Sequence, residues 1–159
     1  MTATATRPSP AATATGARLS ANVASTTEEA EPKLLFTRDR LLVISPSSAW
    51  IARVDATGVS KGTRNVNGLT SGTLARGALW LGNSAGFVAG DGMRARVGYS
   101  PRDLAATGDA VWVAVYNESR VKRVDLDDGR VVATFALNRA PVAVAAGDGL
   151  VAVAVTAPL

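Results

Sequence analysis

The sequence predicts an all-β protein, and three observations support that prediction. Short runs rich in Val, Ala and Leu recur along most of the chain, separated by Gly, Asp, Asn or Pro. No segment sustains the i, i+3, i+4, i+7 apolar pattern of an amphipathic helix beyond about two turns. A unit of about 40 residues recurs in the second half of the chain. With few aromatic residues, these runs suit thin, closely stacked sheets.

The composition changes near Lys33. Residues 1–33 are rich in Ala, Thr, Ser and Pro and hold few large apolar side chains, so they cannot bury enough surface to offset the entropy of ordering. We expect a disordered tail over 1–33 and a repeat domain over 34–159. The composition of the tail is also compatible with an organelle transit peptide or with a mis-assigned start codon.

The expected strands follow one another from residue 40 onward. The first five are RLLVIS (40–45), AWIARVD (49–55), ALWLGN (78–83), GFVAG (86–90) and RARVGY (94–99). The other six are DLAAT (103–107), AVWVAV (110–115), RVKRVDL (120–126), RVVATFAL (130–137), VAVAAG (142–147) and LVAVAV (150–155). Turn-forming residues separate them, as expected for successive hairpins.

The repeat is clearest between two segments offset by 40 residues. SPRDLAATGDAVWVAV, from Ser100, and APVAVAAGDGLVAVAV, from Ala140, share seven of 16 positions without a gap. The unit contains four expected strands, and a proline opens the next copy. Four strands in about 40 residues is the size of one β-propeller blade. A single blade cannot bury both of its apolar faces, so blades stack on one another.

These units predict a partial β-propeller of about three four-stranded blades. Approximate blades cover 34–68, 69–100 and 101–140, with a partial blade over 141–159. Closed propellers usually contain about 4–8 blades. Three explanations therefore stay open: a fragment of a larger propeller, a truncated gene product, or a chain that completes a ring with another copy. We favour the first two.

The three tryptophans follow nearly the same spacing as the repeat. Trp50, Trp80 and Trp112 are 30 and 32 residues apart. Such residues could line a ligand groove. Their spacing instead favours a structural role in packing blade against blade.

The missing residue types exclude several chemistries. The chain has no cysteine, which excludes disulfides and thiolate metal sites, and no histidine, which removes the usual general base and most zinc sites. Asp, Glu, Lys or Tyr could still act as acids or bases with shifted pKa values. We assign no catalytic, cofactor-binding or metal-binding residue and no cofactor.

The net charge of +4 lies entirely within residues 34–159. Basic residues cluster at Arg94, Arg96 and Arg102 and at Arg120, Lys122 and Arg123. A nucleic-acid interface would interleave them with stacking aromatic residues, and only Tyr99 and Tyr116 lie nearby. We expect solvated strand faces and no nucleic-acid partner. No apolar run is long enough to span a membrane, no secretory signal is seen, and the compartment stays open.

One acidic segment has some features of a calcium loop. DLDDG (125–129) carries three aspartates, but its glycine comes fifth rather than sixth, and the twelfth position is Ala136 instead of glutamate. Asp-Gly favours the positive φ of a tight turn, so we interpret the segment as a hairpin turn. Gly-Asp-Gly at 90–92 and at 147–149 receives the same interpretation.

One unit resembles a known repeat. Its first part, P-x-x-L-A-x-x-G-D-x-V-W-V-A, begins at Pro101, and its second part, N-x-x-x-V-x-x-V-D-x-x-x-G-x-V-V-A-T, begins at Asn117. Together they resemble the YVTN-type β-propeller repeat of bacterial and archaeal surface or periplasmic proteins, related to streptogramin-lyase and NHL-type propellers. The resemblance covers 101–140 well, the first half of the next unit, and earlier units loosely. It implies the fold and is nearly silent on function, because propellers host many functions.

We expect a non-catalytic propeller module that serves as a binding or interaction scaffold for a protein or small molecule. The alternative is part of a streptogramin-lyase-like or lactonase-like enzyme whose catalytic residues lie outside this chain. The resemblance implies a catalytic histidine and a divalent ion for the former, and a metal held by Glu, Asn and Asp for the latter. Glu118 is the only glutamate after residue 31, and it lies in a predicted turn. A detached sensor domain is a weaker option, and exposed terminal blades would offer faces for self-association.

Overall fold

The computed structural model describes residues 32–37, 41–55, 58–60 and 66–156. These form 14 β-strands and one short 3-10 helix, η2 (Tyr116–Glu118), which confirms the all-β prediction. The tail predicted over 1–33 lies outside the described residues apart from its last two positions, and Lys33 begins the first strand. The described residues contain no helix with the length and apolarity to cross a membrane.

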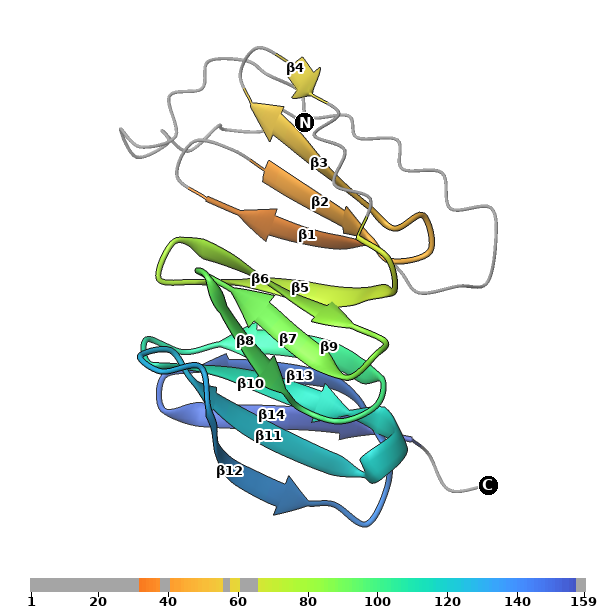
Figure 1. Ribbon diagram of the computed structural model, residues 1–159, viewed down its shortest axis with the longest axis vertical. Helices are drawn as coiled ribbons and strands as arrows, with labels where there is room; N and C mark the ends of the chain where they lie inside the picture. The colour runs from red at the N-terminus through yellow and green to blue at the C-terminus, as the bar shows by residue number, and fades with distance from the viewer. Residues whose placement is uncertain (1–31, 38–40, 56–57, 61–65, 157–159) are drawn as a thin grey trace, which may run out of the picture.

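The strands form four antiparallel sheets in chain order (Figure 1). Sheet 1 contains β1 (Lys33–Phe36), β2 (Leu41–Ser45), β3 (Trp50–Asp55) and β4 (Gly58–Ser60). Sheet 2 contains β5 (Leu69–Ala75), β6 (Ala78–Asn83), β7 (Phe87–Gly90) and β8 (Met93–Arg96). Sheet 3 contains β9 (Pro101–Ala106), β10 (Ala110–Val115), β11 (Arg120–Asp125) and β12 (Val131–Ala136). Sheet 4, as far as the structure describes it, contains β13 (Pro141–Gly147) and β14 (Leu150–Val155).

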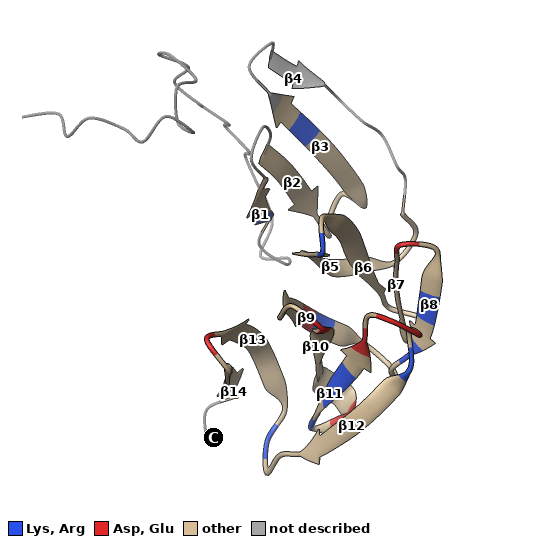
Figure 2. Ribbon diagram, turned by 90° about the vertical axis from the view of Figure 1, so that its left-hand side faces the viewer, with Lys and Arg blue, Asp and Glu red and all other residues tan. Residues whose placement is uncertain are grey.

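The four sheets stack face to face and spread from a common inner edge (Figure 2). The first strand of each sheet, β1, β5, β9 or β13, lies at this inner edge, and each later strand lies further out. β9 packs beside both β5 and β13. The described residues thus form a fan that is open on one side.

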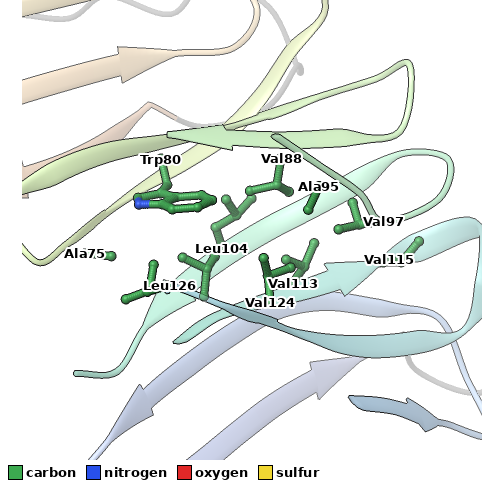
Figure 3. Packing of buried hydrophobic residues seen from close by; sticks show 11 residues of the cluster. Ala75, Trp80, Val88, Ala95, Val97, Leu104, Val113, Val115, Val124 and Leu126 are labelled. Atoms are coloured by element: carbon green, nitrogen blue, oxygen red, sulfur yellow. The ribbon is translucent and has the colours of Figure 1, made fainter. Parts of the chain in front are cut away.

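The largest apolar cluster lies between sheets 2 and 3 (Figure 3). Trp80, on β6, is only 1% exposed, and its indole meets branched side chains of sheet 3 such as Leu104 and Val111. Gly90, on β7, leaves room for the indole: a Cβ built there would lie 2.5 Å from Trp80 Cγ. The large indole of Trp80 therefore packs against smaller branched side chains, as the close packing of a protein interior requires.

The other two sheet junctions contain smaller apolar clusters. Ile44 and Ile51 of sheet 1 pack with Leu69 of sheet 2. Ala105 and Ala114 of sheet 3 pack with Val144 of sheet 4, and the cluster extends over Trp112, Ala146, Val151 and Val153. Every second side chain along a strand therefore points toward the neighbouring sheet and packs against it.

The packing role predicted for the tryptophans holds for two of them. Trp80 and Trp112 each occupy the third position of the second strand in their sheets, and each packs toward the next sheet. Trp50 instead begins the third strand of sheet 1 and packs beside a cluster that contains Val43 and Val54. Its spacing from Trp80 therefore does not reflect an equivalent position.

Candidate functional site

A single carboxylate joins the inner strands of all four sheets. Asp103 lies on β9, and its Oδ1 accepts hydrogen bonds from Lys33 Nζ of sheet 1 at 2.7 Å and from Ser71 Oγ of sheet 2 at 3.0 Å. Its Oδ2 accepts the backbone N–H of Val144 in sheet 4 at 3.0 Å. Lys33 also donates to the carbonyl of Leu104 at 2.5 Å.

The hydrogen bonds of Asp103 satisfy polar groups at the inner edge of the fan. The Val144 N–H lies on an edge strand and needs an acceptor, which the Asp103 carboxylate supplies. Both carboxyl oxygens are engaged, and the ion pair with Lys33 is only partly exposed. We therefore assign Asp103 to holding the sheets together. In the sequence it is only a charged residue, next to Arg102, at the start of the run DLAAT (103–107).

A cavity of about 390 Å³ opens between sheets 3 and 4. It lies where the β9–β10 and β13–β14 turns approach each other. Its lining residues are Thr107, Gly108, Asp109, Trp112, Arg123, Gly147, Asp148, Gly149, Leu150 and Val151. We call this cavity the inter-sheet pocket. Its size lies within the range of about 300–1,000 Å³ that is typical of small-molecule sites.

The indole of Trp112 forms one wall of the inter-sheet pocket. It packs with Val151 and Val153, and its ring centroid lies 5.8 Å from that of Phe135 at an interplanar angle of 32°. Its Nε1 is buried and has no hydrogen-bond partner in the described part of the chain. Because a buried unpaired donor costs about 1–3 kcal/mol, an acceptor placed there would be stabilised.

A fixed ion pair forms the polar side of the pocket. Arg123 Nη2 lies 2.6 Å from Asp109 Oδ2, and Thr107 Oγ1 donates to Asp109 Oδ1 at 3.0 Å. The Thr107 hydrogen bond lowers the pKa of Asp109 below its ordinary value of 3.8, and the charge and hydrogen bond of Arg123 lower it further. Asp109 is therefore ionised at neutral pH and already balanced by Arg123.

The mouth of the pocket is formed by the predicted turn at 147–149, which connects β13 and β14. Asp148 and Gly149 have φ values of 49° and 75°, the left-handed geometry of a tight hairpin turn. A Cβ built on Gly147 or on Gly149 would meet nothing within 4 Å. The turn therefore leaves the entrance open.

The aspartates of DLDDG are occupied within a turn, as expected. The Gly129 N–H donates to the Asp125 carbonyl at 3.1 Å, and the Asp127 N–H donates to Asp125 Oδ1 at 2.7 Å. The Asp127 carboxylate also pairs with Arg76, which follows β5. These contacts give the segment a structural role between β11 and β12.

The basic clusters are paired more fully than expected. The Arg94 guanidinium lies 3.5 Å from the centroid of the Phe87 ring. Glu118, in η2, lies 2.8 Å from Lys122 Nζ and 3.8 Å from Arg120 Nη1. The Lys122 side chain is only 13% exposed, so the prediction of a solvated face is wrong at this position. The ion pair with Glu118 and burial of the apolar lysine stem explain the difference.

No protein-family model and no curated protein matches the sequence. Solved structures do match, at low sequence identity. A streptogramin B lyase gives a TM-score of 0.60 at 15% identity, over 80% of this chain and 49% of that chain. A catalytically inactive histidine-to-alanine variant of virginiamycin B lyase from Staphylococcus aureus, with quinupristin, gives 0.59 at 15% identity, over 78% and 48%. Hsv2p from Kluyveromyces lactis gives 0.60 at 18% identity, over 80% and 47%.

These likenesses confirm the predicted architecture. Streptogramin B lyase is a β-propeller, so the four stacked sheets are a propeller-like repeat arrangement. The chain spans about half the length of the three proteins just described. The low identity shows a shared fold alone, and the YVTN-type pattern stays a resemblance because no family model matches.

Proposed function

We propose that this chain is a non-catalytic propeller-type binding module and that the inter-sheet pocket is its ligand site. The observation that carries the proposal is the buried Nε1–H of Trp112, which has no acceptor among the described residues. The Trp112 side chain lines a cavity of about 390 Å³, and we infer that a ligand held there brings an acceptor to this donor.

The pocket lining indicates the class of ligand. Trp112 and Val151 offer an apolar wall, and the glycine turn leaves the mouth open. The charges of Asp109 and Arg123 already balance each other, so a strongly charged ligand would gain little from them. A small planar, uncharged molecule with one carbonyl acceptor fits these features.

The side chains around the pocket support binding rather than turnover. Catalysis would need a group free to accept or donate a proton near the ligand. Asp109 is committed to Thr107 and Arg123, and its lowered pKa makes it a weaker base. The chain also contains no histidine and no cysteine that could act in their place.

Isothermal titration calorimetry with quinolin-2-one, a planar lactam, tests this proposal. We expect saturable 1:1 binding per chain, weakened at least fivefold by Trp112→Phe, which keeps an aromatic ring and removes the N–H. Trp50→Phe is the matched control, because Trp50 does not line the pocket, and should bind as the wild type does. Equal affinity in the wild type and Trp112→Phe would reject the pocket assignment.

The likeness to streptogramin lyases favours one alternative, a partial lyase-like enzyme. The inactivity of the histidine-to-alanine variant of virginiamycin B lyase indicates that its chemistry depends on a histidine. This chain has none, so such an activity would need residues from outside it. Incubation of this chain with quinupristin followed by mass spectrometry tests whether the chain itself is catalytic: a converted product would reject the non-catalytic proposal.

A further inference from the structure

A second cavity, of about 220 Å³, lies where sheets 1, 2 and 3 approach one another. It is lined by the β2–β3 turn, the start of β5 and the start of β9. Four of its lining residues carry polar side chains, and the others are a leucine and two prolines; the polar four are Ser47, Thr70, Ser100 and Arg102. We call this cavity the bulge cavity. It shares no residue with the inter-sheet pocket.

Two of the polar residues occupy the same position in successive inner strands. The register between β5 and β6 shifts at Thr70, and the register between β9 and β10 shifts at Arg102, so each residue sits at a β-bulge. A bulge leaves its extra residue unpaired and re-aims the side chain. In sheet 4 the corresponding residue is Val142. Because an apolar residue serves at that position, the fold itself does not require a threonine or an arginine there.

The hydroxyl of Thr70 is buried without a partner. Its Oγ1 forms no hydrogen bond in the described part of the chain. Gly82 leaves room for it, since a Cβ built on Gly82 would lie 2.8 Å from this oxygen. A buried hydroxyl that has lost its water and gained no partner is destabilising. A ligand oxygen held in the bulge cavity is a source of the missing acceptor.

The charge of Arg102 is not balanced by the protein. Arg102 is exposed and forms no ion pair with the described residues, and none of the described residues that line the cavity is acidic. Two carboxylates lie on neighbouring segments of sheet 3, but both are already paired: Asp103 with Lys33, and Glu118 with Lys122. The bulge cavity is therefore positively charged and favours an anion.

Ser100 adds a hydroxyl at a position with backbone strain. Its φ is 58°, in the left-handed region that disfavours a residue with a Cβ. Gly68 holds the corresponding place before β5 with a φ of 71°. A glycine at residue 100 would avoid the strain, and strain of this kind concentrates at functional sites.

We propose that the bulge cavity binds a small phosphate group. Arg102 supplies the charge, and its planar guanidinium matches two phosphate oxygens at once. The hydroxyls of Ser47, Thr70 and Ser100 supply further donors. The volume lies below the range of drug-sized ligands, which suits a small ion. This site is separate from the inter-sheet pocket and does not depend on its ligand.

Isothermal titration calorimetry with inorganic phosphate on the 159-residue chain tests the site. We expect saturable 1:1 binding at low salt, weakened at least tenfold by Arg102→Gln and at least threefold by Thr70→Val, which removes the hydroxyl. Arg96→Gln is the matched control. Arg96 is also exposed and lies 5.9 Å from the Phe87 ring centroid, much as Arg102 lies 6.0 Å from that of Tyr116, but it does not line the cavity. This variant should bind phosphate as the wild type does.

Two further measurements separate the sources of the phosphate group and the two sites. Glycerol 3-phosphate that binds at least as tightly as phosphate assigns a phosphate monoester, and weaker binding assigns the free ion. Arg102→Gln should bind quinolin-2-one with unchanged affinity, because the inter-sheet pocket is untouched. A wild-type chain that shows no saturable phosphate binding at millimolar concentration would overturn the proposal. An equal loss of affinity in Arg102→Gln and Arg96→Gln would overturn it as well, since it would show only general attraction to a basic chain.

Discussion

Lys33 Nζ lies 2.7 Å from Asp103 Oδ1, although 70 residues separate them in the chain. The contact joins the inner strand of sheet 1 to that of sheet 3. Because Asp103 also accepts from Ser71 and from the Val144 N–H, its loss should loosen all four sheets. We expect Asp103→Ala to lower the free energy of unfolding by about 2–3 kcal/mol, measured by urea denaturation.

Asp103→Asn removes only part of these hydrogen bonds and therefore tests them separately. It keeps one acceptor for Lys33 or Ser71, but its amide nitrogen cannot accept the Val144 N–H. We expect an intermediate loss of about 1–2 kcal/mol. If both variants were as stable as the wild type, the inner carboxylate would have no role in holding the sheets.

Gly90 and Trp80 define the tightest part of the junction between sheets 2 and 3. A methyl group at Gly90 would overlap the indole, so Gly90→Ala should destabilise the protein by about 1–3 kcal/mol through overpacking. Gly108→Ala is the matched control, since a Cβ there meets nothing within 4 Å. Equal midpoints of thermal unfolding for the two variants would contradict the packing described here.

The Asp109 carboxylate gives a testable pH dependence. Its pKa is lower in the folded state than its ordinary value, so the folded state binds its proton less readily than the unfolded state. The stability that it contributes is therefore present above the unfolded pKa and is lost as the pH falls through the folded pKa. The melting temperature of the wild type should exceed that of Asp109→Asn at pH 6, and the difference should shrink as the pH falls below the ordinary pKa of 3.8.

Thr107→Val identifies the cause of that pKa shift. The Thr107 hydroxyl contributes most to lowering the pKa of Asp109, and valine removes it at nearly the same volume. The stability difference should then disappear at a higher pH than in the wild type. A difference between wild type and Asp109→Asn that persists undiminished at acidic pH would show that the carboxylate contributes no proton-linked stability.

Arg76 and Asp127 form an exposed link between sheets 2 and 3. The Arg76 Nε also donates to the Gly108 carbonyl at 2.9 Å, and the hydrogen bond with Asp127 raises the pKa of Arg76. Exposed pairs contribute little because water and salt screen them. Asp127→Asn should therefore leave the midpoint of urea denaturation close to that of the wild type. A clearly lower midpoint at 1 M salt would contradict this account.

Strands with strong alternation could be predicted closely from the sequence. The runs over 78–83, 110–115 and 150–155 coincide with β6, β10 and β14, because branched residues bounded by tight turns admit few other structures. Residues aligned by the 40-residue offset also occupy corresponding positions on β9 and β13 and on β10 and β14.

Other strands could not be recognised from local pattern. β5 (Leu69–Ala75) contains Thr, Ser and Gly where large apolar residues would be expected. The structure explains one of these positions: a Cβ on Gly72 would lie 2.4 Å from Ile44 Cδ1 of sheet 1. β1 and β4 contain only four and three residues, which is too few for a recognisable alternating pattern.

The candidate site depends on contacts between distant residues, which explains why the sequence did not reveal it. Trp112 and Val151 lie on different sheets, and the Trp112 Nε1–H is unpaired only because of how those sheets meet. Asp103 likewise gains its role from partners on three other sheets. A sequence pattern shows neither relationship.

The Trp112 indole N–H signal in a ¹H–¹⁵N correlation spectrum tests the central claim most directly. Its absence from the spectrum of Trp112→Phe assigns it. On titration with quinolin-2-one, we predict that this signal moves downfield as the carbonyl accepts the N–H, while the indole signal of buried Trp80 stays in place. A Trp112 signal that does not move at saturating ligand would contradict the proposed binding site.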